Sequence, residues 1–256
     1  MVVVALLLAT MPAAAQYQLA EGLELERYDS ATRTLHADGD VHVLKIDPEL
    51  WRLDVLVAGG DDKARRHLDQ WGEDHGLYAA INAGMFQADG HTHVGFCQVG
   101  GEVLNRAPNR YQSAFVCDPL DPDDPIFAII DLDEVPLQDL RRQYRTVVQN
   151  LRLIKHDGRN RWSPTRKRWR EAALAEDRRG RALFILCTRA LSMHEFNELV
   201  LALPLDVVAA QHLEGNATAG LWVGLLPSGY ASGIDATGKV PNVLGIRPRV
   251  KGTTVE

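Results

Sequence analysis

The chain has 256 residues, of which 46% are hydrophobic and 24% are charged, and its formal net charge is −6. This composition is typical of a globular protein and argues against a disordered chain. The acidic balance provides no bulk attraction to nucleic acid or to anionic membranes, so no nucleic-acid partner is expected. The length alone allows one large domain or two small ones.

The first element in chain order is an apolar leader, MVVVALLLATMPAAAQ. Residues 2–9 form its hydrophobic stretch, and the alanines at 13–15 supply small residues for cleavage before Gln16, although basic residues are missing at its start. The stretch is shorter than the ~20 apolar residues of a transmembrane helix, so no stable membrane span is expected. We predict a signal peptide over 1–15 and an exported protein, periplasmic or extracellular. A short buried strand is the alternative.

Strand patterns separated by turn signals dominate the rest of the chain. Strands are expected at 41–46, 50–57, 77–82, 94–99, 102–105, 113–118, 125–131, 145–154, 181–187 and 205–213. Gly100 and Gly101 lie between two of these segments and indicate a hairpin. A helix is expected over 61–76, beginning at its acidic residues, with Ala64, Leu68 and Trp71 on its apolar face and Gly76 as its stop.

Two further helices are expected, at 136–144 and at 192–203. The second begins with Ser192 and Glu195, which form a capping box, and ends before Pro204. Because strands outnumber helices and often follow one another directly, the sequence predicts an α+β fold. We expect a single domain, residues 16–256, built on a mixed, largely antiparallel sheet with a few flanking helices.

The chain has three cysteines, Cys97, Cys117 and Cys187, and none are at the CxxC spacing of a metal site. In an oxidising compartment Cys97 could pair with Cys117. Buried free thiols are an equal alternative, because these two cysteines lie in strand-like segments.

The first group of candidate site residues follows the strand that ends at Asn82. Gly84 permits a close backbone approach or a positive φ angle, which leaves Asn82 as a firmly placed amide able to bind a ligand hydroxyl. A turn asparagine is the alternative. His91 and His93 would share one face of a strand and could bind a metal ion, but no third ligand stands at motif spacing, so no metal is expected.

A basic segment with interleaved tryptophans occupies residues 152–170. The arginine fork matches phosphate oxygens, so this segment is a candidate phosphate or phosphodiester site. A solvated loop is the plain alternative.

The third group is HLEGNATAG, residues 212–220, which lies between two apolar runs. Glu214 ends a strand, and His212 lies on the same side if the strand continues that far. Gly215 removes side-chain bulk beside the carboxylate, and Asn216 tolerates a left-handed backbone. The segment is therefore either a hinge that positions a reactive carboxylate or a turn whose glutamate faces water.

Three large enzyme classes are disfavoured, because the chain has no GxSxG elbow, no P-loop and no GxGxxG after a strand. Several segments, taken in chain order, instead resemble the phosphodiester glycosidase domain family over about residues 40–248. They are INAGMF, VGFCQVGGEVLN, RTVVQNLRLI, WREAALAEDRRGRALFILCT, the helix–strand–turn from 192 to 223, and GKVPNVLGI.

The resemblance implies catalytic roles for Glu214 and Arg170. It also implies a set of substrate-binding residues, namely Asn82, Gly84, Gln149, Gly215 and Asn216. The chain departs from the family pattern in having glutamate at 214 where many members have aspartate, asparagine at 216 in place of glycine, and Leu151-Arg152 in place of Gly-Pro. The family arginine matches Arg170, with Glu171 one position away.

The activity implied is cleavage of a sugar-1-phosphodiester bond in a glycan or cell-envelope polymer, without a cofactor. Glycosidases generally use two carboxylates. The second is open among four candidates: Asp89, Glu171, Asp177 and Asp235. Two other hypotheses are a non-catalytic module that binds phosphodiester polysaccharides and a metal-dependent phosphodiesterase using His91 and His93. The oligomeric state is unknown from the sequence.

Overall fold

The computed structural model describes residues 15–59, 64–224, 231–234 and 238–249. Its strands are β1 Gln16–Ala20, β2 Leu23–Asp29, β3 Thr34–Leu35, β4 Val41–Ile46, β5 Trp51–Val57, β6 Ala79–Asn82, β7 Cys97–Val99, β8 Glu102–Asn105, β9 Ser113–Pro119, β10 Phe127–Asp131, β11 Tyr144–Lys155, β12 Arg159–Asn160, β13 Trp169–Asp177, β14 Ala182–Leu191, β15 Val207–Gly215, β16 Leu221–Val223, β17 Ser232–Ile234 and β18 Asn242–Pro248. Its helices are α1 Leu68–His75, α2 Leu137–Gln143, α3 Met193–Ala202 and the short 3-10 helix η1 Asn216–Thr218.

The strands form two sheets. In the larger one the main path runs β1-β2-β4-β14-β13-β15-β11-β7-β8, and the smaller one has the order β17-β16-β6-β18-β5. Neighbours such as β13 and β15, or β5 and β18, pair antiparallel. The predicted α+β fold, a single domain on a largely antiparallel sheet with a few helices, is confirmed.

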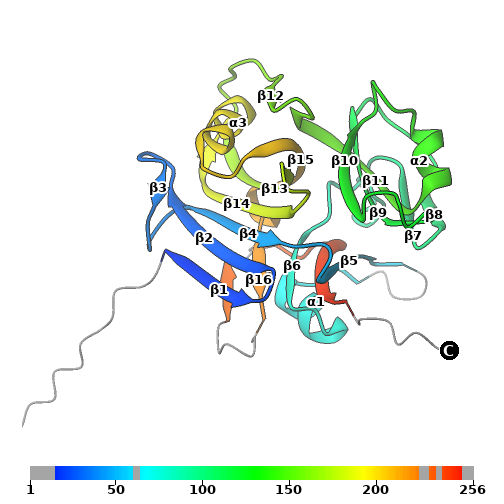
Figure 1. The fold of residues 1–256 in the computed structure, drawn as a ribbon, viewed down its shortest axis with the longest axis horizontal. Helices are drawn as coiled ribbons and strands as arrows, with labels where there is room; N and C mark the ends of the chain where they lie inside the picture. The colour runs from blue at the N-terminus through cyan, green and yellow to red at the C-terminus, as the bar shows by residue number, and fades with distance from the viewer. Residues whose placement is uncertain (1–14, 60–63, 225–230, 235–237, 250–256) are drawn as a thin grey trace, which may run out of the picture.

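The main hydrophobic core lies between the two sheets. It contains side chains from both, including Leu44 and Phe184 of the larger sheet and Ile81 and Leu244 of the smaller one. Each helix covers an outer face: α3 packs on β13 and β14, α1 packs on β6 and β18, and α2 packs on β9 and β11 (Figure 1).

Helix α1 differs from its prediction because it begins at Leu68 and not at the acidic residues near 61. Arg66 instead makes an isolated antiparallel bridge with Val240, and their two backbone hydrogen bonds measure 3.2 and 2.8 Å. Ala64 is exposed and outside the helix, whereas Leu68 and Trp71 are buried as expected. The predicted stop at Gly76 is confirmed by its left-handed backbone, φ 61°.

Helix α3 matches its prediction closely. The Ser192 hydroxyl accepts a hydrogen bond from the Glu195 amide, and the Glu195 carboxylate accepts one from the Ser192 amide. Both halves of the capping box are therefore present, which satisfies two amides that the first turn would leave unpaired.

Cys97, Cys117 and Cys187 are all buried free thiols, so the alternative of a Cys97–Cys117 bridge is not realised in this structure. Residues 1–14 of the predicted leader lie outside the described residues. Among the helices of the described ranges, none is both long and apolar enough to cross a membrane.

Candidate active site

Glu214 lies at the end of β15, next to β13, and its side chain is half-buried. Ala172 of β13 faces Glu214 and Ala173 faces His212, so Leu213 is one extra residue in β15. This irregularity is a β-bulge, a device that re-aims neighbouring side chains at the end of a sheet. The segment HLEGN is therefore a bulged strand end, and the chain turns only at Asn216.

Two buried side chains lie beside Glu214. Glu171 and His212 are 1% and 4% exposed, and Nδ1 of His212 contacts Oε1 of Glu171 in an ion pair. The other carboxylate oxygen of Glu171 accepts a hydrogen bond from the indole Nε1 of Trp169 at 2.6 Å. Both oxygens of Glu171 are thus occupied, so this carboxylate is held in a fixed position. We call Glu171, His212 and Glu214 the carboxylate cluster.

The carboxylate cluster perturbs the proton affinities of its members. The pKa of Glu214 is raised mainly by burial and further by the charge of Glu171. The amide of Gly215 and the charge of His212 act in the opposite direction but do not cancel this shift. For His212, burial disfavours the charged ring, but the charge and hydrogen bond of Glu171 and the charge of Glu214 outweigh it and raise the pKa. Glu214 is the member of the cluster with appreciable exposure to solvent.

Tyr111 connects the carboxylate cluster with the INAGMF segment. Burial and the charge of Glu214 raise the pKa of the Tyr111 phenol, so the two side chains are within electrostatic reach. The same hydroxyl donates to the sulfur of Met85 at 3.9 Å. Two segments separated by more than a hundred residues thus approach one another, and Tyr111 was not among the residues singled out from the sequence. A lone tyrosine in a loop carries no spacing signal that could have identified it.

Gly84 permits a second contact between INAGMF and the centre of the larger sheet. Its φ angle is +146°, and an added Cβ would lie 2.4 Å from Oδ1 of Asn150 and 2.6 Å from Cε1 of His93. Asn150 also donates to the carbonyl of Ala83 at 3.1 Å. Since Leu151 pairs with His212, this contact brings the turn next to β15. The sequence expectation that Gly84 serves close approach or positive φ agrees with this geometry.

The two predicted amides have different surroundings. Gln149 uses its whole amide within the protein: its oxygen accepts from the amides of Phe96 and Asn109, and its nitrogen donates to the carbonyls of Asn109 and Tyr111. Asn82 is fully buried, and neither polar atom of its side chain has a partner within the described part of the chain. A ligand-binding role for either remains a prediction.

Arg170 is the second residue of β13 and is half-buried, next to the cluster residue Glu171. Its Nε is buried and has no hydrogen-bond partner among the described residues. Gly215 lies across from Glu171, where an added Cβ would approach Cδ1 of Trp169 to 2.9 Å and the Arg170 carbonyl to 3.3 Å. Gly215 therefore permits the close packing of β13 against β15 at this point.

Asn216 is exposed and has the left-handed backbone that its residue type tolerates, with φ 55°. It begins the 3-10 helix that follows the bulged strand end. A ligand-binding role for Asn216 stays a prediction.

Much of the basic segment 152–170 is neutralised by acidic neighbours. Arg152 contacts Asp131 and Asp133 at 2.9 and 2.7 Å, and Arg168 contacts Glu195 at 2.5 Å. The last two residues of this segment, Trp169 and Arg170, begin β13, the strand that also holds Glu171.

His91 and His93 do not act as a pair. Nε2 of the buried His93 contacts the Gln149 carbonyl at 2.9 Å, while the ring of His91 contacts Asp89 within its own turn. The described ranges contain no group of three or more metal-ligating side chains.

The four candidates for the second carboxylate lie in different parts of the structure or outside the described residues. Glu171 lies in the carboxylate cluster, whereas Asp177 lies at the far end of β13 and pairs with Arg181 at 2.7 Å. Asp89 accepts hydrogen bonds from Thr92 in its own turn, and Asp235 lies outside the described residues.

Comparison with known proteins adds independent findings. A family model described as phosphodiester glycosidase matches residues 75–247. A search of curated proteins found no significant match.

Solved structures share the fold. A hypothetical protein from Synechocystis has a TM-score of 0.65 at 15% identity, with 94% of this chain and 65% of that chain covered, so the present chain spans less than two thirds of its length. The catalytic domain of zebrafish N-acetylglucosamine-1-phosphodiester alpha-N-acetylglucosaminidase, auto-inhibited by its pro-peptide, has a TM-score of 0.63 at 15% identity, with 93% and 87% covered. A putative exported protein from Burkholderia pseudomallei has a TM-score of 0.52 at 13% identity, with 81% and 74% covered.

These identities establish a shared fold and no shared substrate. The family match, by contrast, covers more than half of the chain, including INAGMF and the whole carboxylate cluster. The chain belongs to the phosphodiester glycosidase family.

Proposed function

We propose that this protein is an exported glycosidase that hydrolyses the bond between C1 of a sugar and an oxygen of a phosphodiester. Membership of a hydrolase family and the carboxylate cluster support this proposal. In the balanced reaction, water adds its hydroxyl to C1, the C1–O bond breaks, and the phosphate monoester leaves with the electron pair of that bond. The substrate class is a glycan or cell-envelope polymer that contains such diesters.

The observation that carries the proposal is the unequal environment of the two glutamates. Glu171 is buried and has both oxygens engaged, whereas Glu214 is half-exposed and has a raised pKa. A raised pKa makes a carboxylate a better base, so Glu214 takes the proton of the attacking water. Glu171 acts as a positioning residue, because it fixes the ring of His212, two residues before Glu214 in β15.

Arg170 receives the phosphate. A phosphate monoester leaves with ~1.5 to 2 negative charges near neutral pH, and a guanidinium stabilises that charge without proton transfer. The unpartnered Nε of Arg170 supports this role. The exposed amide of Asn216 binds a sugar hydroxyl at the open side, while Gly84 and Gly215 permit the close packing around the site. Asn82 and Gln149 are proposed to support the sugar-binding side of the site.

The test is turnover of an aryl or sugar 1-phosphodiester by the wild type, Glu214→Gln and Glu73→Gln. Glu73 is an exposed helical glutamate outside the site, so its variant is a control for the loss of one charge. We expect Glu214→Gln to lose about 100-fold or more in kcat, as for the loss of a general base, and Glu73→Gln to retain wild-type activity. Equal rates in all three proteins would remove Glu214 from the mechanism.

The same experiment tests the alternative hypothesis that the protein is a non-catalytic module that binds phosphodiester polysaccharides. Retention of the diester on the protein with no product at any enzyme concentration would favour binding over cleavage. Export of the protein is part of the proposal and is supported by the apolar leader. One structural relative also bears the description of a putative exported protein. Detection of the chain with residues 1–15 removed, in the periplasm or medium, would test it.

A further inference from the structure

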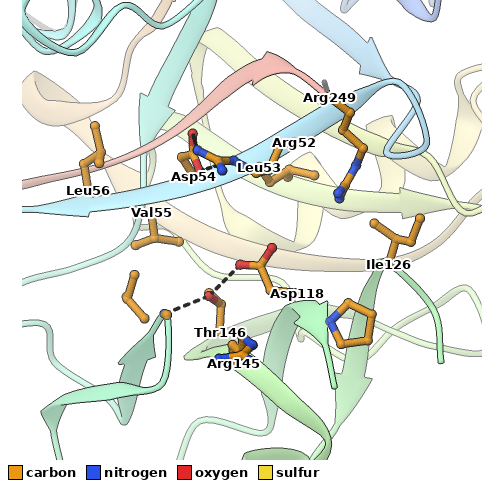
Figure 2. A pocket seen from close by; sticks show the side chains of 13 residues that line it. Arg52, Leu53, Asp54, Val55, Leu56, Asp118, Ile126, Arg145, Thr146 and Arg249 are labelled. Atoms are coloured by element: carbon orange, nitrogen blue, oxygen red, sulfur yellow. Dashed lines mark hydrogen bonds and ion pairs between the residues drawn. The ribbon is translucent and has the colours of Figure 1, made fainter. Parts of the chain in front are cut away.

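A second charged region lies away from β13 and β15, the two strands that hold the carboxylate cluster. It is a cleft of about 590 Å³ between β5, the edge of the smaller sheet, and the β7–β8 turn, β9 and β11 of the larger one. Three arginines line it, Arg52, Arg145 and Arg249, and we call it the arginine cleft (Figure 2). Its volume is within the range of small-molecule sites in proteins.

The arginine cleft is separate from the candidate active site. Strand β11 has Thr146 in the cleft and Asn150 next to the INAGMF turn, and four residues of strand span about 13 Å. Strand β9 likewise has Asp118 in the cleft and Ser113 opposite Asn150.

The arginines of the cleft keep hydrogen-bond donors free. Within the described part of the chain, the Arg145 guanidinium is exposed and has no partner. Arg249 is anchored by Nε to the Pro48 carbonyl at 2.6 Å, which leaves both terminal amino groups without a described partner. Arg52 binds Asp54 through Nε and one terminal nitrogen, and its other terminal nitrogen has no partner among the described residues.

The acidic residues of the cleft do not cancel this charge. Asp54 is already bound by Arg52 and by Arg247, the latter at 2.9 Å. Asp118 accepts a hydrogen bond from the Thr146 hydroxyl at 3.1 Å, and it has a left-handed backbone with φ 56°. Four arginines with two carboxylates therefore give the region a positive balance in a chain whose net charge is −6.

The arrangement of donors points to a tetrahedral anion. Arg52 and Arg249 lie on the β5 side, and Arg145 lies beside Thr146 on the β11 side, as Figure 2 shows. A phosphate group presents oxygens in several directions and can contact both sides at once, whereas a carboxylate has two oxygens in one plane. Apolar side chains, including Leu53, Val55 and Ile126, line the remaining surface and suit the carbon skeleton of a sugar.

We propose that the arginine cleft binds a phosphate group, either free or carried on a sugar. This proposal rests on the cleft itself and not on the chemistry of Glu214. In a polymer with repeated phosphodiesters the cleft would bind a diester other than the one being cleaved; this extension rests on the proposed function.

The test is titration of the full chain with inorganic phosphate, glucose 6-phosphate and glucose at constant ionic strength, followed by calorimetry and by amide NMR. We expect both phosphate compounds to shift the amide resonances of Gly100, Asp118 and Thr146. Equal affinities for phosphate and glucose 6-phosphate would mean that the cleft recognises the anion alone. Tighter binding of glucose 6-phosphate would mean that the apolar wall also contributes to binding. Both outcomes support the site. If glucose bound as tightly as the two phosphate compounds, the proposed phosphate site would be overturned.

Four variants make the test specific. Arg145→Ala and Arg249→Ala should each weaken phosphate binding about 5- to 10-fold, as expected for loss of charge-assisted hydrogen bonds. Asp118→Asn keeps the shape and the left-handed backbone but removes a negative charge, so it should strengthen binding. Arg159→Ala, a control on the exposed strand β12 outside the cleft, should change the affinity less than about 2-fold.

Unchanged affinity in Arg145→Ala and Arg249→Ala would overturn the proposal, as would an equal loss in Arg159→Ala. Resonance shifts confined to Glu214 and Gly215 would also overturn it, because the phosphate would then occupy the candidate active site. Binding is measured in Glu214→Gln as well. If Glu214→Gln binds phosphate but does not turn over substrate, the cleft stands independently of the active site. If a cleft variant loses phosphate binding but keeps turnover, the active-site proposal stands independently of the cleft.

Discussion

The carboxylate cluster and the arginine cleft are both built from charged side chains at the ends of strands, but burial makes them behave differently. In the cluster, Glu171 and His212 are nearly inaccessible and satisfy one another, and their charges change the proton affinity of Glu214. In the cleft, Arg145 is exposed and the Arg52 side chain is half-exposed, and part of their hydrogen-bonding capacity is unused among the described residues.

This difference follows from the solvent around each group. Water screens the charges of the cleft, so their mutual interactions contribute little to stability and they remain available for a ligand. The cluster lacks this screening, so removal of one partner leaves the other charge buried and uncompensated. We therefore expect the cluster to control stability and protonation, and the cleft to control binding.

The largest expected effect comes from Glu171→Ala. It leaves His212 buried without its partner and should reduce the free energy of unfolding by about 3 to 5 kcal/mol. Urea unfolding measures this, with the exposed Glu73→Gln as control. The double variant Glu171→Ala/His212→Ala should be less destabilised than the sum of the two single variants. Strict additivity would contradict an ion pair and make the two regions energetically alike.

The second prediction compares one glycine near each region. Gly84→Ala places a methyl group against Asn150 in a backbone conformation that only glycine adopts readily, so a loss of about 2 to 4 kcal/mol is expected. Gly100→Ala, at the cleft, meets no atom within 4 Å and has only the cost of a left-handed backbone, about 1 kcal/mol. Thermal unfolding of both variants tests the difference. Equal losses would mean that the INAGMF turn is not packed against β11.

These examples also define what the sequence could predict. The capping box of α3 depends on residues three apart, and the alternation in β5 depends on residues two apart. Both elements could therefore be predicted from local sequence patterns. The start of α1 was predicted wrongly because Arg66 pairs with Val240, a residue far away in the chain.

The carboxylate cluster shows the same limit at the candidate site. Glu214 and His212 were singled out from the break between two apolar runs, and the family resemblance added the predicted catalytic roles of Glu214 and Arg170. The pairing of Glu171 with His212 depends on the register between β13 and β15 and on the bulge at Leu213. No pattern within either strand specifies that register, so Glu171 stood among four open carboxylates until the strands were aligned.

The third prediction concerns pH. The pKa of Glu214 is higher in the folded protein than its ordinary value of 4.5, so the folded state binds this proton more tightly than the unfolded state. The associated stability is present at low pH and is lost as the pH rises from about 4.5 through the folded pKa. For His212, whose pKa is also raised, the contribution is complete below 6.5 and is lost as the pH rises through its folded pKa.

Unfolding free energies measured from pH 4 to 9 should therefore decline in two steps for these two groups. Glu214→Gln should remove the first step, which begins near pH 4.5, and leave part of the second. Arg145→Ala, a variant of the exposed cleft, should retain both. A first step of wild-type size in Glu214→Gln would assign it to another carboxylate.

The smallest expected effect is that of Arg145→Ala on stability. Its guanidinium is exposed and has no partner in the described part of the chain, so its removal breaks no hydrogen bond and leaves no buried group unsatisfied. It also relieves repulsion from Arg52 and Arg249 across the cleft. The change in unfolding free energy should lie within about 0.5 kcal/mol and shrink further at high salt. Urea unfolding at low and high salt measures both. A loss above about 1 kcal/mol would show that Arg145 stabilises the fold, and the contrast between a structural cluster and a ligand-binding cleft would then fail at its simplest point.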